Sequence, residues 1–407
     1  MDQPTHENRE DPVRVGPSPP FPVRPTGPPP GGQRSQKRRS WATVLVPFAS
    51  GLLGVALGIG ALFAADVLPA PPPVTVVRPE VTRTEVVRTE PGFRTATQIA
   101  QQVIPSIVEV RLVSPGGGEE DDILNNQAIA GSGSGVVFRA DGYVVTNQHV
   151  VGALDDARLQ VIFADGRIYP AEAVGTDPHT DLAVLQIPAS DLSTLEPGST
   201  ETSRIGDPAI AVGNPLGLEG GPSLTVGVIS AFARTLRTPQ GNLFGMIQTD
   251  APITRGSSGG ALVDPDGRLL GITTAIGVTD VGAEGLGFAV PVEVVEEVVQ
   301  DLIENGKVEH AFLGMQGVTA FQDSDDGAQV PAGAEVVEFL PGSALQQAGA
   351  RAGDVIVALE GQRIETMDEL VVELRHYRAG EEVGLQLQRR DELLTIDVVL
   401  DRRPEDL

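Results

Sequence analysis

The chain contains no cysteine among its 407 residues. This absence excludes disulfide bonds, thiolate metal sites and a cysteine nucleophile. It indicates no compartment, because proteins without disulfides occur on either side of a membrane. Aromatic residues make up only 4% of the chain, so Val, Leu, Ala and Ile carry most of its apolar content. Together with 48 glycines, this composition favours β structure with many turns.

Basic residues are also scarce, since 29 Lys and Arg stand against 55 Asp and Glu, for a net charge of −26. Nucleic acid is therefore not an expected partner, because binding it rests on clustered Lys and Arg. An acidic surface mainly favours solubility. No group of His, Asp and Glu has the spacing of a metal site, so we expect neither a metal nor another cofactor.

Long uncharged runs are absent except between Ser40 and Ala65. Residues 1–40 are rich in Pro and Gly and predict a disordered tail that ends in a basic cluster. Residues 41–65 exceed the about 20 residues that cross a bilayer and predict a transmembrane helix. The basic cluster before it predicts a cytoplasmic N-terminus and an extracytoplasmic remainder. Residues 66–94 predict a Pro-rich linker.

Two other interpretations of the apolar run remain. A signal sequence cleaved near Ala65 is one, although the run is longer than the usual apolar core of about 7–15 residues. A buried core helix is the other, and it is poorly supported because nothing folded precedes the run to bury it.

Residues 95–308 consist largely of short apolar segments separated by Gly, Asp-Gly or Pro. This pattern is typical of antiparallel sandwiches and barrels. The segments form two similar sets, which predict an all-β domain of two six-stranded antiparallel barrels with a cleft between them. A helix over 292–305 ends this domain, closed by Gly306. Residues 309–402 predict a separate small α+β domain.

A serine set among glycines stands out in the second set of segments: Gly256, Ser258, Gly259 and Gly260. Acyl transfer needs a hydroxyl presented in this way, with free amides around it. The amides of Gly256 and Ser258 are candidates to stabilise an oxyanion, and one such donor contributes roughly a hundred- to thousand-fold in rate. Taken alone, the stretch fits a Gly/Ser-rich turn without chemistry equally well.

A base for that serine has to come from the five histidines. Three of them lie outside the predicted barrels: His6, His310 and His376. His149 follows a predicted strand and enters a polar turn, which holds its ring rigidly. Asp181 begins an apolar strand and needs a partner there, because an unpaired buried carboxylate is costly. A histidine N–H would satisfy it. His179 is a weaker base, since its connection looks exposed.

The order His149, Asp181, Ser258 resembles trypsin-like serine proteases. Five local strings resemble the HtrA (Deg) family: 146–151, 180–185, 211–217, 256–260 and 287–291. The C-terminal domain resembles the PDZ domain of that family. The likeness covers roughly residues 95–402, so the chain is similar to a membrane-anchored HtrA protease with one PDZ domain.

This resemblance implies a trypsin-like endopeptidase that hydrolyses peptide bonds in misfolded or specific envelope proteins. Ser258 would attack the scissile carbonyl, His149 would take and return the proton, and Asp181 would orient the imidazole. The amides of Gly256 and Ser258 would form the oxyanion hole. The resemblance also implies polypeptide substrates and a homotrimer.

The specificity pocket of trypsin-like enzymes has the residue six before the serine as its floor. Here that residue is Pro252, with the apolar Ile253 and Ile272 nearby. No acid is present at the floor, so we expect cleavage after small or medium aliphatic residues.

Three departures from the family pattern concern the serine loop. Ser257 and Ala261 stand where Asn and Pro are usual, and the two glycines after Ser258 identify it as the nucleophile rather than Ser257. Arg255 replaces a common Pro at a loop that can switch between inactive and active forms in this family. A latent resting enzyme is therefore a hypothesis.

In the PDZ-like domain, the amides of Leu313, Gly314 and Met315 would bind the terminal carboxylate of a peptide added as a strand at a sheet edge. A purely structural small domain is the alternative.

For the whole chain, the alternative function from a different class is that of a non-proteolytic chaperone or scaffold that retains the protease fold. Esterase activity at the same site also remains open.

Overall fold

The computed structural model describes residues 94–113, 129–152, 158–214, 221–239, 241–274 and 286–404. The predicted tail, the predicted transmembrane helix and the linker up to residue 93 lie outside the described residues. Among the helices of the described ranges, none has both the length and the apolar content to cross a membrane.

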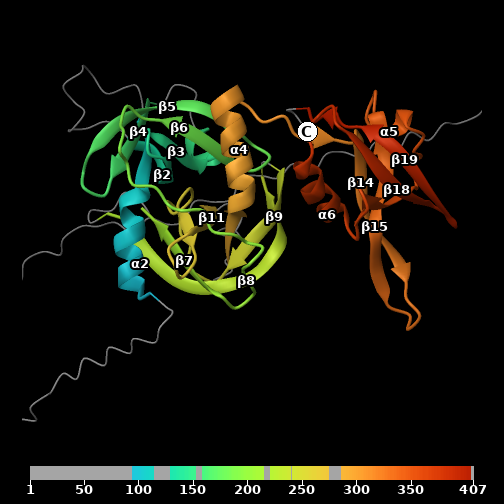
Figure 1. The fold of residues 1–407 in the computed structure, drawn as a ribbon, viewed down its shortest axis with the longest axis horizontal. Helices are drawn as coiled ribbons and strands as arrows, with labels where there is room; N and C mark the ends of the chain where they lie inside the picture. Colours follow the sequence, from blue (N-terminus) through green and yellow to red (C-terminus); the bar gives the residue numbers. More distant parts are fainter. Residues whose placement is uncertain are drawn as a thin grey trace, which may run out of the picture. The chain divides into compact units, whose positions relative to one another are not determined.

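Two closed antiparallel barrels form the first part of the described chain (Figure 1). The first has the strand order β1-β2-β3-β6-β5-β4. Its strands are β1 (Ile107–Val113), β2 (Ile129–Arg139), β3 (Tyr143–Asn147), β4 (Arg158–Phe163), β5 (Ile168–Asp177) and β6 (Leu182–Gln186). Closure leaves no unpaired sheet edge. Buried Val, Leu and Ile side chains fill the interior.

The second barrel has the order β10-β11-β12-β9-β8-β7. Its strands are β7 (Pro208–Gly213), β8 (Ser223–Thr238), β9 (Gly241–Thr249), β10 (Ala261–Val263), β11 (Leu269–Thr274) and β12 (Gly287–Pro291). Every residue of β10 and β11 is buried. The loop that carries the candidate serine therefore leads into the rigid core of this barrel. The predicted pair of six-stranded barrels is confirmed.

Helices close the barrels. α2 (Ala96–Val103) begins at a capping box formed by Thr95 and Gln98. η1 (Ile104–Ser106) leads into β1, and the single-turn α3 (Gln148–Val151) follows β3. The helix predicted over 292–305 is confirmed as α4 (Val292–Asn305), which ends at Gly306 in the left-handed region, with φ 71°. α4 contacts β5 and β6 of one barrel and β11 and β12 of the other, so its apolar face packs against both barrels (Figure 1).

The C-terminal domain is built on a sheet in the order β14-β15-β16-β18-β19, with β17 paired to β16 and a separate β13–β20 pair. The strands are β13 (Ala311–Phe312), β14 (Met315–Asp323), β15 (Gln329–Phe339), β16 (Val355–Leu359), β17 (Gln362–Arg363), β18 (Glu382–Arg389), β19 (Glu392–Val399) and β20 (Asp401–Arg402). The helices are α5 (Ala344–Gln347), α6 (Met367–Glu373) and η3 (Leu374–His376). The expected α+β class is confirmed. β14 is an edge strand of this sheet.

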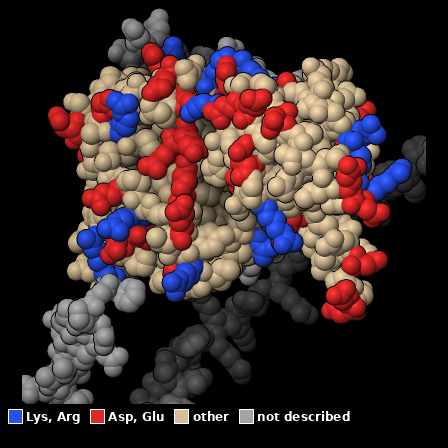
Figure 2. Space-filling view, turned by 45° about the vertical axis from the view of Figure 1, so that its right-hand side comes forward, with Lys and Arg blue, Asp and Glu red and all other residues tan. Residues whose placement is uncertain are grey.

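Acidic side chains predominate on the face drawn in Figure 2. This distribution agrees with the net charge of −26. A surface of this kind repels a phosphate backbone rather than binding it.

Candidate active site

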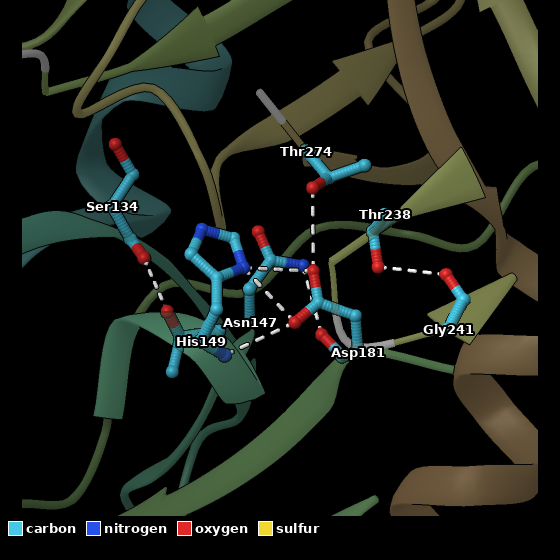
Figure 3. A network of polar contacts seen from close by, with 8 residues as sticks. Ser134, Asn147, His149, Asp181, Thr238, Gly241 and Thr274 are labelled. Carbon is cyan, nitrogen blue, oxygen red and sulfur yellow. Dashed lines mark hydrogen bonds and ion pairs between the residues drawn. The ribbon is translucent and has the colours of Figure 1, made fainter. Parts of the chain in front are cut away.

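His149 and Asp181 form a hydrogen-bonded pair at the edge of the first barrel (Figure 3). His149 lies on α3, and its Nδ1 is 2.8 and 2.9 Å from the two carboxylate oxygens of Asp181. Its backbone N–H also donates to Asp181 Oδ1, at 3.0 Å. A carboxylate only accepts hydrogen bonds, so Nδ1 carries the proton and Nε2 is the basic nitrogen of the ring.

The backbone of Asp181 is held in an uncommon conformation. Its φ is 58°, in the left-handed region, which Asp tolerates better than most residues. Its carbonyl accepts hydrogen bonds from Gln148 N and Asn147 Nδ2, each at 3.0 Å. Thr274 Oγ1, from the second barrel, lies 3.3 Å from Oδ2. The buried carboxylate is thus satisfied from both barrels, and its direction toward His149 is fixed.

Ser258 lies in the loop before β10 and is 5% exposed. Its carbonyl accepts a hydrogen bond from Ser134 N of the first barrel, at 2.7 Å. The next residue, Gly259, has φ 85°, and a Cβ there would lie 2.1 Å from Ser134 O and 2.4 Å from Thr146 Oγ1. Only glycine fits that position, because real Cβ atoms do not approach other atoms so closely. The glycine after the serine therefore lets the two barrels meet at the candidate nucleophile.

The peptide group between Ser257 and Ser258 is held rigidly. The Ser257 carbonyl accepts from Gly260 N at 3.0 Å and from Thr273 Oγ1 at 2.7 Å. The N–H of a trans peptide points opposite to its carbonyl. The Ser258 amide is therefore directed away from these two donors.

Of the three residues expected at the specificity pocket, Pro252 lines a cavity of about 50 Å³ beside Ser257. Ile253 is partly buried and packs against a cluster in the second barrel. Ile272 is fully buried, pairs with Ala261 and Val290, and does not line that cavity. The lining also includes four hydroxyl side chains that the sequence did not single out: Ser223, Thr225, Thr254 and Thr273.

His179 does not share the environment of His149. Its ring meets the ring of His310 edge to face, with centroids 5.1 Å apart. Burial, with Arg403 nearby, lowers the pKa of His179 to about 4. Asp177, which the sequence did not single out, lies 2.9 and 3.0 Å from His310 Nε2. Within the described ranges, no group of three or more His, Asp or Glu side chains is placed to hold a metal ion.

The environment of His179 predicts a pH-dependent stability. Burial by itself raises the pKa of Asp177, but the hydrogen bond from His310 and its charge hold that pKa below its ordinary value. An unfolded His titrates near 6.5 and folded His179 near 4, so between these values only the unfolded chain takes up the proton. The titration of His179 therefore does not reduce the free energy of unfolding above pH 6.5, and it reduces that free energy progressively as the pH falls from 6.5 toward 4. The Asp177 carboxyl adds a further loss of stability as the pH falls below the ordinary pKa of an Asp, 3.8.

Urea unfolding midpoints at pH values across this window measure the effect. Substituting His179→Asn removes the group that titrates differently in the two states, so the midpoint of the variant is expected to fall less steeply with pH. Equal slopes for the variant and the wild type would contradict the assignment. The other ionisable groups facing this ring are present in both proteins: Asp177, His310, Arg375 and Arg403.

Comparisons with known proteins find relatives of both domains. Residues 133–272 match the trypsin-like peptidase domain, and residues 312–400 match the PDZ domain. The periplasmic pH-dependent serine endoprotease DegQ of Escherichia coli is 37% identical over 318 residues, which cover 74% of this chain and 69% of DegQ. The periplasmic serine endoprotease DegP of the same organism is 37% identical over 72% of this chain and 60% of DegP. A structure of the HtrA-type protease AlgW with a decapeptide is 30% identical, with a TM-score of 0.62 over 76% of this chain and 99% of AlgW.

Proposed function

This chain belongs to the HtrA family of serine endoproteases, and we propose that it hydrolyses peptide bonds with His149, Asp181 and Ser258. The observation that carries the proposal is the contact between His149 Nδ1 and the Asp181 carboxylate at 2.8 Å. It lies in the part of the chain that matches the trypsin-like peptidase domain, which also contains Ser258. Loss of casein cleavage in a Ser258→Ala variant tests the proposal.

In this mechanism, Ser258 Oγ attacks the scissile carbonyl while His149 Nε2 takes its proton. Asp181 stabilises the imidazolium that forms and keeps the ring in the required tautomer. The imidazolium then gives the proton to the leaving amine, which leaves an acyl group on Ser258. A water molecule repeats the sequence with the same base and releases the acid.

The oxyanion hole of the proposed mechanism is made by the amides of Gly256 and Ser258. The fixed peptide group between Ser257 and Ser258 supports one donor. The other proposed donor is the amide of Gly256. The φ of Gly256, 89°, supports this role, since the left-handed region is one in which few residues other than glycine are stable. Each donor contributes roughly a hundred- to a thousand-fold in kcat.

The proposed specificity is for a small or medium aliphatic side chain before the cleaved bond. Pro252 and the hydroxyls beside it line a cavity of only about 50 Å³ without a carboxylate. The proposed pocket also includes Ile253, which packs against the second barrel, and Ile272, which is buried in that barrel. Among the described residues, none in the lining is acidic, so a cationic side chain would find no charge partner among them.

A matched set of peptides that differ only in the residue before the cleaved bond tests this specificity. Peptides with Ala or Val there are expected to have kcat/KM at least about tenfold above those with Arg or Lys. The Ser258→Ala variant measures the background for each peptide. A preference for Arg or Lys would contradict the proposed pocket.

The PDZ domain is proposed to bind C-terminal peptides through the amides of Leu313, Gly314 and Met315. Ser343 Oγ donates to the Leu313 carbonyl at 3.1 Å, and Leu340 N donates to the Gly314 carbonyl at 2.9 Å. The amides of Gly314 and Met315 therefore point away from these two donors, and we propose that they bind the carboxylate. Leu313, Met315, Leu370 and Leu374 line part of a cavity of about 590 Å³, whose lining also includes Arg237, Asn242 and Phe244 of the second barrel.

Amidation of the peptide terminus tests this binding mode without altering the protein. A labelled peptide ending in Val with a free carboxylate is expected to bind at least about tenfold tighter than its amide, because hydrogen bonds to a charged group contribute about 1.5–3 kcal/mol. Fluorescence anisotropy measures both dissociation constants. Equal affinities would contradict carboxylate recognition and favour a structural role for the domain.

We further propose that residues 41–65 tether the protease to the cytoplasmic membrane, with its domains outside the cytoplasm, as a homotrimer acting on misfolded or specific envelope proteins. The relatives DegQ and DegP are described as periplasmic proteases. Recovery of the full chain in the soluble fraction of lysed cells would contradict the tether. Suppression of client aggregation by the Ser258→Ala variant and the wild type alike, without cleavage, would favour the chaperone alternative.

A further inference from the structure

Ser134 connects the first barrel to the loop that carries the nucleophile. It lies on β2, is fully buried, and uses all of its polar atoms; Figure 3 shows one of these contacts. Its hydroxyl donates to the Gly256 carbonyl at 2.6 Å and accepts from Asn214 N at 2.8 Å. Its N–H donates to the Ser258 carbonyl at 2.7 Å, and its carbonyl accepts from Thr146 Oγ1 at 2.7 Å. Ser134 thus holds the loop on both sides of Ser257.

The contact at Gly256 fixes one peptide group of that loop. The Gly256 carbonyl accepts from Ser134, while the N–H at the other end of the same peptide group, that of Ser257, donates to Thr254 O at 2.9 Å. The preceding peptide group is different. Among the described residues, neither the Arg255 carbonyl nor the Gly256 N–H has a hydrogen-bond partner. The direction of the Gly256 N–H therefore depends on the backbone angles of Gly256, which its held carbonyl restrains.

The hydroxyl has close neighbours. A Cβ added at Gly213 would lie 3.0 Å from Ser134 Oγ, which is closer than nine in ten real contacts. Removal of the hydroxyl would leave the partly buried Gly256 carbonyl and the buried Asn214 amide without this partner. Buried polar groups left unpaired rearrange or lose stability.

We propose that the Ser134 hydroxyl is a positioning residue of the oxyanion hole, which sets the direction of the Gly256 amide by holding the Gly256 carbonyl. This inference rests on the proposed function, since it takes the amides of Gly256 and Ser258 as the oxyanion donors. A merely structural buried serine would affect stability alone. A positioning serine affects the transition state and its analogues more than the binding of substrate.

The Ser134→Ala variant tests the proposal, with Ser106→Ala as the matched control. Ser106 is also fully buried, but its hydroxyl has no hydrogen-bond partner among the described residues. The measurements are kcat and KM on one peptide substrate and the inhibition constant of the corresponding peptide aldehyde, whose hemiacetal oxygen occupies the oxyanion hole. Circular dichroism measures the folded fraction, and all values are expressed per folded molecule.

For Ser134→Ala, kcat is expected to fall about 10- to 100-fold, less than for direct loss of one oxyanion donor, with KM within about threefold. The aldehyde is expected to bind more weakly by the same factor as kcat. Ser106→Ala is expected to leave all three values unchanged. If Ser134→Ala does not fold, Ser134→Cys keeps the size and offers only a weak donor, and the same direction is expected.

Values for both Ser134 variants equal to those of Ser106→Ala would overturn the proposal. So would a lower kcat with an unchanged aldehyde constant, because the oxyanion hole would then be intact. Failure of the proposed function has a different signature: the wild type itself would cleave no faster than Ser258→Ala, and both proposals would fall together.

Discussion

Substitution of Ser258 by alanine is expected to lower kcat for peptide hydrolysis by on the order of a million-fold. The variant has no atom to attack the scissile carbonyl, so only the oxyanion donors and substrate positioning remain. The fold is expected to be retained, because the contact of Ser258 with the first barrel is made by its backbone carbonyl and Ser134 N. Initial rates of casein cleavage, with circular dichroism to verify the fold, measure the effect.

Ser257→Ala is the matched control for this prediction. The contacts of Ser257 with Thr254, Gly260 and Thr273 are made by its backbone, and alanine keeps them. We expect the control to retain kcat within about tenfold, well inside the effect of losing a nucleophile. An inactive Ser257→Ala variant together with an active Ser258→Ala variant would show that Ser257, not Ser258, is the nucleophile.

Asp181→Asn is expected to lower kcat by about ten thousand-fold with little change in KM. Asparagine has the same shape and also tolerates the left-handed backbone observed at Asp181, with φ 58°. Its amide group, however, can present a donor to His149 Nδ1, which favours the tautomer that has its proton on Nε2. The ring then cannot accept the proton of Ser258. Steady-state kinetics on a peptide substrate measure both constants.

Asp177→Asn provides the control, since Asp177 is also buried and also bonds a histidine, but that histidine is His310. This variant is expected to lose stability while keeping kcat per folded molecule within a few-fold. A similar loss of kcat in both variants would contradict the assignment of Asp181 as the orienting carboxylate.

Much of the fold was predictable because local patterns determine it. Short apolar segments separated by turn residues predicted both barrels, and the apolar face of 292–305 with Gly306 after it predicted α4. His149 and Asp181 were recognisable because each sits at a strand end, where a polar side chain in an apolar setting needs a partner. Their contact in the structure agrees with that reasoning.

The contacts that could not be predicted from the sequence join residues far apart in the chain, and these residues belong to no recognisable functional motif. Ser134 belongs to a short run of Gly and Ser residues without a functional signal, and its hydrogen bond to Gly256 joins residues 122 positions apart. The pair of Asp177 and His310 joins positions 133 apart. Ile272 follows the apolar pattern of its strand, but that pattern does not distinguish a residue lining a pocket from one in the barrel core. Register and closure decide these placements.

Covalent labelling of the active protease with a fluorophosphonate, followed by peptide mapping in a mass spectrometer, tests the central claim most directly. Such reagents modify a serine only when a base activates it and an oxyanion hole receives the phosphoryl oxygen. We predict a single adduct on Ser258, absent from Ser258→Ala and strongly reduced in Asp181→Asn. An adduct on Ser257, or no adduct on a folded protein that cleaves casein, would contradict the proposed mechanism.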